Sequence, residues 1–219
     1  MIKDYFERID TEAKAYWLGF LYADGCVSQD LKSVVLELSS VDEDHVYKFA
    51  NAIGSNHKVS AHGKNKNFTR IAVSCKQMGI DLYNHGCVPR KSMILEFPKD
   101  NIVPEGLIYH FIRGYFDGDG CLSHSSGMRK RNDRNGNKLY PYDKWFLKFV
   151  GTESMLNGIA HYMDMSNKLY RPTDNKNHYS LKCGGKILVK NKMDKIYENA
   201  TIYLDRKYDK YIELCNNCA

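Results

Sequence analysis

The chain has 219 residues, and 43% of them are hydrophobic, which is enough for a packed core and excludes a disordered chain. Its 32 basic and 26 acidic residues give a net charge of +6, which fits a nucleic-acid partner without requiring one. No apolar run approaches the roughly 20 residues that span a bilayer, so neither a membrane partner nor a secretory signal is expected.

The first half of the chain predicts alternating helices and strands. The expected elements are a helix that Asp10 or Thr11 caps and that ends near Asp24, a strand at 34–38, a helix at 42–53, strands at 58–62 and 67–75, and a helix at 76–85. The last two strands form a hairpin. In its second strand the apolar Ile71 and Val73 should lie on one face, with Arg70 and Ala72 on the other.

The second half repeats this order after a linker at 98–104. The expected elements are a helix from about Pro104 to Asp119, a strand at 145–149, a helix that opens at Thr152, a hairpin of 168–170 and 178–183, and helices at 189–200 and 205–214. The repeat favours two halves, 1–100 and 101–219.

One insertion breaks the symmetry between the halves. Residues 125–143 replace a much shorter link of the first half, and we expect them to form a long loop. Its basic residues are Arg129, Lys130, Arg131, Arg134 and Lys138.

The cysteines indicate a reducing compartment. There are seven, an odd number, and they are scattered, so we expect free thiols in a protein that works inside the cell, in the cytoplasm, the nucleoid or an organelle. Cys215 and Cys218 lack the second pair that would complete a structural zinc site.

A duplicated stretch ties the two halves together. Residues 15–28 match residues 110–123 without a gap, and Asp24 falls on Asp119. Both acids follow a predicted helix, where they face the negative end of the helix dipole. Helix stability alone would therefore not place them there, and a cation would compensate.

Small residues recur in both copies. They are spaced one helical turn apart, at Gly19 and Ala23 in the first copy and at Gly114 and Gly118 in the second. Such faces let two helix backbones approach closely. If the copies pack through them, Asp24 comes beside Asp119, and two carboxylates that close repel unless a metal ion lies between them.

Both copies resemble the LAGLIDADG motif of homing endonucleases, in the two-motif, single-chain form. The tandem copies, the segment 86–92 and the late segment 204–208 extend the resemblance over nearly the whole chain. It implies an α+β fold of two pseudo-symmetric αββαββα halves. The halves would pack through paired LAGLIDADG helices, and their antiparallel sheets would form a saddle over double-stranded DNA.

The resemblance also implies a metal site and its chemistry. Two or three Mg²⁺ ions would be held by the carboxylates of Asp24 and Asp119 and by the carbonyls of Ala23 and Gly118. Lys91 and Lys207 occupy equivalent places late in each half and would assist the attacking water and offset charge on the phosphate. Asp117 has Tyr22 as its counterpart, so it is not expected to be a symmetric ligand.

The DNA-binding residues are expected on the polar face of each hairpin, because a twisted ribbon fits a major groove. In the first half they are Lys58, Ser60, His62, Lys64, Lys66 and Arg70. In the second half they are Lys168, Tyr170, Arg171, Lys176 and Lys182. The basic insertion should add contacts to DNA phosphates.

The implied function is a double-strand break in a long, non-palindromic DNA site, the reaction of intron homing, made by a monomer. The cut would cross a minor groove and leave short 3′ overhangs. One alternative is an RNA maturase, which would bind intron RNA and need neither aspartate. The other is a DNA-binding regulator that has lost cleavage, and the presence of both acids argues against it.

Overall fold

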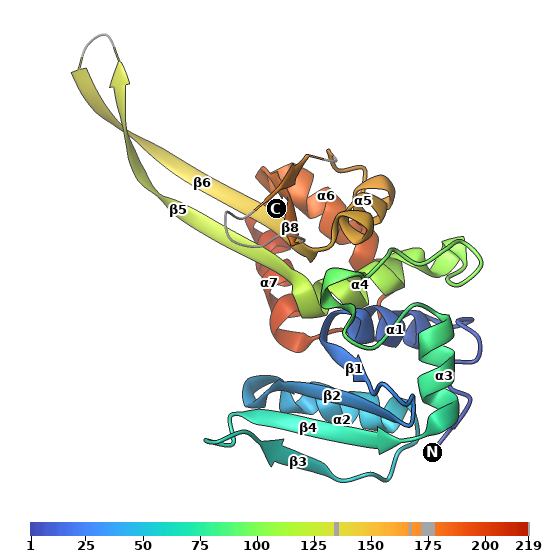
Figure 1. Cartoon of the computed structure of the whole chain (residues 1–219). Coiled ribbons are helices and arrows are strands. Elements are labelled where there is room, and N and C mark those ends of the chain that lie inside the picture. Colours follow the sequence, from blue (N-terminus) through green and yellow to red (C-terminus); the bar gives the residue numbers. More distant parts are fainter. Residues whose placement is uncertain (134–135, 167, 172–177, 219) are drawn as a thin grey trace.

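The computed structural model describes residues 1–133, 136–166, 168–171 and 178–218 (Figure 1). It contains two antiparallel four-stranded sheets, with strand orders β1-β2-β4-β3 and β5-β6-β8-β7. Each sheet follows one of the two matched helices, so the expected α+β architecture of two similar halves is confirmed. No helix of the described residues is both long and apolar enough to cross a membrane.

The first half is built much as its sequence pattern predicts. Its elements are α1 (Glu12–Asp24), β1 (Gly25–Val27), β2 (Ser33–Ser39), α2 (Glu43–Ala52), β3 (Val59–His62), β4 (Phe68–Ser74) and α3 (Lys76–Asn84), with short 3₁₀ turns at Ser40–Asp42 and Lys91–Met93. Thr11 caps α1, its side chain accepting a hydrogen bond from the backbone N–H of Lys14. Ile71 and Val73 of β4 are buried while Ala72 is exposed, as the alternation predicts.

The second half follows the same order. Its elements are a 3₁₀ turn (Glu105–Leu107), α4 (Ile108–Asp119), β5 (Gly120–Asp133), β6 (Gly136–Gly151), α5 (Glu153–Tyr162), β7 (Leu169–Tyr170), β8 (Tyr179–Gly184), α6 (Lys186–Tyr197) and α7 (Asp205–Cys218). The helix expected at 189–200 begins and ends three residues earlier, and the last helix runs past 214 to Cys218.

The basic insertion is not a loop, and our expectation there was wrong. It belongs to the two long strands β5 and β6, which pair without a break from Gly120 opposite Phe149 to Asp133 opposite Gly136. The continuous register gives the backbone hydrogen-bonding groups between the strands a partner, which a long loop would leave to water. This β5–β6 ribbon projects far beyond the rest of the molecule (Figure 1).

Helices α1 and α4 cross at the centre and join the halves (Figure 1). Every residue of α1 from Ala15 to Tyr22 is buried, as expected of a helix that is apolar on all sides. A Cβ atom at Gly19 would overlap the backbone carbonyl of Phe111, and one at Gly114 would overlap that of Tyr16. The two backbones therefore touch, and both helices end beside each other.

Candidate active site

The two aspartates are the last residues of the paired helices, Asp24 of α1 and Asp119 of α4. A Cβ at Gly118 would overlap that of Ala23 and lie 3.1 Å from Oδ2 of Asp24, so the Asp24 carboxylate rests against the backbone just before Asp119. Both side chains are open to solvent. Among the described residues, neither has a hydrogen-bond or ion-pair partner.

The surroundings of these carboxylates oppose their ionisation. Desolvation by the surrounding protein raises the pKa of Asp24 to about 6, and the nearby charge of Asp119 adds to the rise. Desolvation also raises the pKa of Asp119, while the positive charges of Lys91 and Lys207 act in the opposite direction. The two carboxylates are therefore better suited to bind a cation than to form a salt bridge within the protein.

The two lysines lie behind the aspartates in equivalent positions. The Nζ atom of Lys91 donates to the carbonyl of Gly25, and that of Lys207 donates to the carbonyl of Gly120, at 2.8 Å. Gly25 and Gly120 are the residues that directly follow the two aspartates. Only 7% of Lys91 and 6% of Lys207 is exposed, which is uncommon for lysine and shows that both side chains enter the protein.

Lys207 is held more extensively than Lys91. Its Nζ atom also donates to the carbonyl of Phe116 at 2.6 Å and to that of Gly118 at 3.2 Å. Desolvation lowers the pKa of Lys207 to about 8, so part of the population can lose its proton near neutral pH. The carbonyl of Gly118, which the family resemblance implies as a metal ligand, thus already accepts a hydrogen bond from an ammonium group.

The exposed face of the first sheet carries most of the expected DNA-binding residues. Register places Ser60, Arg70 and Glu37 in one row across β3, β4 and β2. His62 lies 2.6 Å from the Glu37 carboxylate and 3.5 Å from the Arg70 guanidinium. The remaining candidates flank β3 as exposed side chains, and they are Lys58, Lys64 and Lys66.

In the second sheet the expected residues divide between two faces. The ammonium groups of Lys168 and Lys182 lie 5.6 and 5.4 Å from the centre of the Tyr170 ring. Arg171, the next residue along the chain, lies instead 5.5 Å from the ring of Tyr179. Lys176 lies outside the described residues.

The β5–β6 ribbon also separates its basic residues. Arg129 pairs with Tyr140 and Arg131 with Lys138, and alternation puts these four on one face of the ribbon. Lys130 pairs with Leu139 on the opposite face. Arg134 lies outside the described residues.

Two basic residues escaped the sequence-based selection, although the signal was present. Lys144 and Lys148 alternate with buried Trp145 and Leu147 in β6, so they share the exposed face. Lys148 lies directly opposite Lys182 of β8. Like charges in that arrangement destabilise a sheet, and an anion such as a phosphate would relieve the repulsion.

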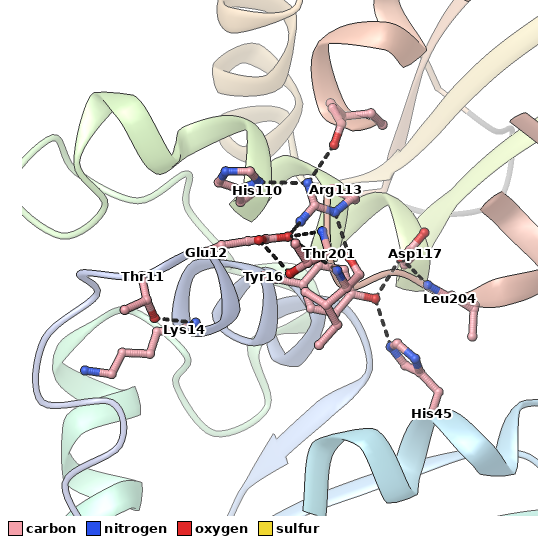
Figure 2. Close-up of polar contacts among 12 residues, drawn as sticks. Thr11, Glu12, Lys14, Tyr16, His45, His110, Arg113, Asp117, Thr201 and Leu204 are labelled. Carbon is pink, nitrogen blue, oxygen red and sulfur yellow. Dashed lines mark hydrogen bonds and ion pairs between the residues drawn. The ribbon is translucent and has the colours of Figure 1, made fainter. Parts of the chain in front are cut away.

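Asp117 lies between the halves and away from the exposed pair, within a buried polar network (Figure 2). Its carboxylate accepts from the hydroxyl of Tyr16 and from the backbone N–H of Leu204, both at 2.7 Å. Burial raises the pKa of Asp117 to about 6. In the same network Glu12 forms an ion pair of 2.6 Å with Arg113, which the sequence gave no means of finding.

No protein-family model and no curated protein sequence matches the chain. Among solved structures, the LAGLIDADG homing endonuclease I-SmaMI bound to cleaved DNA superposes with a TM-score of 0.63 at 10% identity, over 92% of this chain and 87% of that one. The LAGLIDADG meganuclease I-AabMI bound to uncleaved DNA gives 0.62 at 13% identity, over 92% and 88%. I-SmaMI with uncleaved DNA and calcium ions gives 0.61 at 11%, over 92% and 89%. The chain therefore has the single-chain LAGLIDADG homing endonuclease fold that its duplicated motif predicts.

Proposed function

We propose that this chain is a metal-dependent endonuclease that cuts both strands of a long, non-palindromic DNA site. One observation carries the proposal: two carboxylates that have no partner in the described part of the chain lie together at the tip of the central helix pair, each with a buried lysine behind it. Basic sheet faces flank this point. I-SmaMI and I-AabMI, which share the fold, are bound to DNA in their structures, which supports DNA as the partner.

We propose Mg²⁺ as the metal, bound as two or three ions. The donor set fits a hard cation, because the carboxylates of Asp24 and Asp119 lack protein partners among the described residues. The carbonyl of Ala23 would supply a further metal ligand. The Gly118 carbonyl could supply another, because it keeps a second lone pair besides the one that accepts from Lys207. When bound, the ions would activate a water and stabilise the leaving oxygen at each scissile phosphate.

The two lysines would act on the phosphate. An ammonium group behind each aspartate offsets the negative charge that develops during hydrolysis. The lowered pKa of Lys207 lets it exchange a proton near neutral pH, which suits a group that assists a water molecule. One backbone carbonyl holds Lys91 and three hold Lys207, so each side chain is kept behind its aspartate.

The basic faces would bind the DNA on either side of the cut. One polypeptide supplies both aspartates, so a monomer suffices for a double-strand break. The two halves differ in their exposed side chains and in the β5–β6 ribbon, so the target should be non-palindromic. We propose a cut across the minor groove that leaves short 3′ overhangs, and the resulting double-strand break would serve intron homing.

The test begins by recovering a cleaved sequence from a randomised DNA library with the purified chain and Mg²⁺. On that site Asp24→Asn and Asp119→Asn should each slow double-strand cleavage by about 10²–10³-fold while leaving the DNA dissociation constant within a few-fold. Asp30→Asn, at an exposed acid of the same half, is the matched control and should cleave normally.

Undiminished cleavage by the double variant Asp24→Asn/Asp119→Asn would overturn the proposal. Intact DNA together with assisted splicing of an intron RNA would point to the maturase function instead.

A further inference from the structure

The two active-site lysines reach their positions by different routes. The segment that leads to Lys91 is held inside its own half. The hydroxyl of Tyr22 donates to the carbonyl of His85, and the His85 ring lies 2.7 Å from the carbonyl of Phe6. The thiol of Cys87 contacts the carbonyl of Leu21. All of these residues belong to the first half. Among the described residues, the hydrogen bond of this segment to the second half comes after the lysine, where the hydroxyl of Thr152 donates to the carbonyl of Leu95.

The segment that leads to Lys207 is held across the interface. It runs from the end of α6 to the start of α7, and Glu12 of α1 accepts from the backbone N–H and the hydroxyl of Thr201, at 2.7 and 2.8 Å (Figure 2). Arg113 of α4 donates to the carbonyl of Ile202 at 2.9 Å and to Glu12 at 2.6 Å. The first turn of α1 therefore holds the segment before α7, which belongs to the other half, through hydrogen bonds.

A second contact across the interface lies three residues before Lys207, at Leu204. Asp117 accepts from the N–H of Leu204, and the carbonyl of Leu204 in turn accepts from the N–H of Lys207 at 2.9 Å, at the start of α7. The same oxygen of Asp117 accepts from the Tyr16 hydroxyl, which also lies 2.8 Å from Nε2 of His45. Tyr16, Asp117 and Leu204 are all at most 3% exposed, so water does not compete for these bonds.

Two surface ion pairs complete the attachment of α7 to the first half. Lys48 of α2 lies 2.6 Å from Asp205, and Arg206 lies 2.8 Å from Asp42, just before α2. The segment 201–206 thus contacts the first half on both sides of Leu204, through Thr201 before it and through Asp205 and Arg206 after it.

We propose that Tyr16 and Asp117 are positioning residues through which the first half places Lys207. Cleavage of the DNA strand served by Lys207 then depends on the contact of Tyr16 with Asp117 and Leu204, while cleavage of the strand served by Lys91 does not depend on that contact. This inference rests on the proposed endonuclease function. Its physical basis is that catalytic groups displaced by about 1 Å can lose up to 10²-fold in rate. A buried carboxylate that loses one donor has no water to replace it.

The central experiment measures the cleavage of each strand separately, on a plasmid that carries one target site. Lys207→Met and Lys91→Met first identify which strand each lysine serves. Each variant should accumulate plasmid nicked in one strand before it is linearised, and the two variants should leave opposite strands uncut. Tyr16→Phe keeps the ring but removes the hydroxyl. It should slow the Lys207 strand by about tenfold and leave the other strand and the DNA dissociation constant within twofold.

Three further variants separate positioning from loss of structure. Tyr109→Phe removes a hydroxyl that bonds the carbonyl of Tyr162, away from Lys207, and should leave the strand ratio unchanged. Asp117→Asn, which keeps an acceptor for both donors, should retain more of the Lys207-strand rate than Asp117→Leu. Should Tyr16→Phe fail to fold, Glu12→Gln, at a half-buried position, tests the contact between Glu12 and Thr201 instead. It should slow the same strand.

The outcomes distinguish this inference from the function beneath it. A wild-type chain that leaves both strands intact would overturn the proposed function and the inference together. A wild-type chain that cuts, with Tyr16→Phe slowing both strands equally or neither strand, would overturn the inference alone.

Discussion

Asp24 and Asp119 are poorly placed for stability and well placed for binding a cation. Each sits at the C-terminus of a helix, beside the other, with a raised pKa and no partner among the described residues. Residues that hold charge for catalysis commonly lower the stability of the free protein. Removing one of the two charges should therefore affect stability and cleavage in opposite directions.

Asp24→Asn should raise the melting temperature of the metal-free protein at pH 7. The pKa of Asp24 rises from 3.8 to about 6 on folding, so protonation favours the folded state. That stabilisation is fully present below pH 3.8 and is lost as the pH rises through about 6. Because the side chain is exposed, we discount the effect for solvent screening and expect a gain of roughly 2–4 °C.

Calorimetry at two pH values checks this prediction. The gain should shrink at pH 4, where Asp24 of the wild type is largely protonated. Asp30→Asn should give no gain at either pH, since the pKa of Asp30 is lowered by its bond with Ser28. A lower melting temperature for Asp24→Asn at pH 7 would contradict the argument.

At the scale of elements, the helix pair decides where the aspartates lie. The glycines at the crossing leave room for the opposing backbone, and that contact brings two helix ends together. A backbone carbonyl cannot move aside as a flexible side chain can. The crossing should therefore tolerate no added methyl group.

Gly114→Ala should destabilise the protein by about 3 kcal/mol, because its Cβ would overlap the carbonyl of Tyr16. Gly106→Ala is the matched control, since a Cβ there has no atom within 4 Å, and it should change stability by no more than about 0.5 kcal/mol. Denaturant unfolding measures both. Equal effects of the two substitutions would show that the helix crossing is not tightly packed.

At the scale of the whole molecule, the β5–β6 ribbon makes the two halves unequal. It extends the second sheet well away from the central helices and carries Arg129 and Arg131 on one face (Figure 1). The first half has only the short strand β1 in the equivalent place. We expect the bound DNA to be covered further on the side of the second half.

Arg129→Gln and Arg131→Gln should each weaken DNA binding for all sequences and lower the salt slope of binding by about one unit. Lys130→Gln removes the same charge from the opposite face of the ribbon and should leave the slope nearly unchanged. Titrations of a target and a scrambled duplex at several salt concentrations measure the slopes. Equal losses for Arg129→Gln and Lys130→Gln would mean that neither face is preferred.

The sequence by itself predicted the repeated architecture and the pairing of Asp24 with Asp119, and the family resemblance added Lys91 and Lys207 as candidates. An ungapped match places Asp24 on Asp119, and the alternation in β4 predicts which of its faces is buried, because both signals are local or internal to the chain. The ribbon was missed because residues 125–143 are polar, so no apolar alternation marked them as strands.

Only the tertiary structure decided how the site is held. Glu12 meets Arg113 at a separation of 101 residues and Thr201 at 189. The sequence sets Asp117 apart because its counterpart is Tyr22, but only its burial between the halves shows that it accepts hydrogen bonds from Tyr16 and Leu204. Such pairings depend on where two packed halves touch, and no local pattern of residues records that contact.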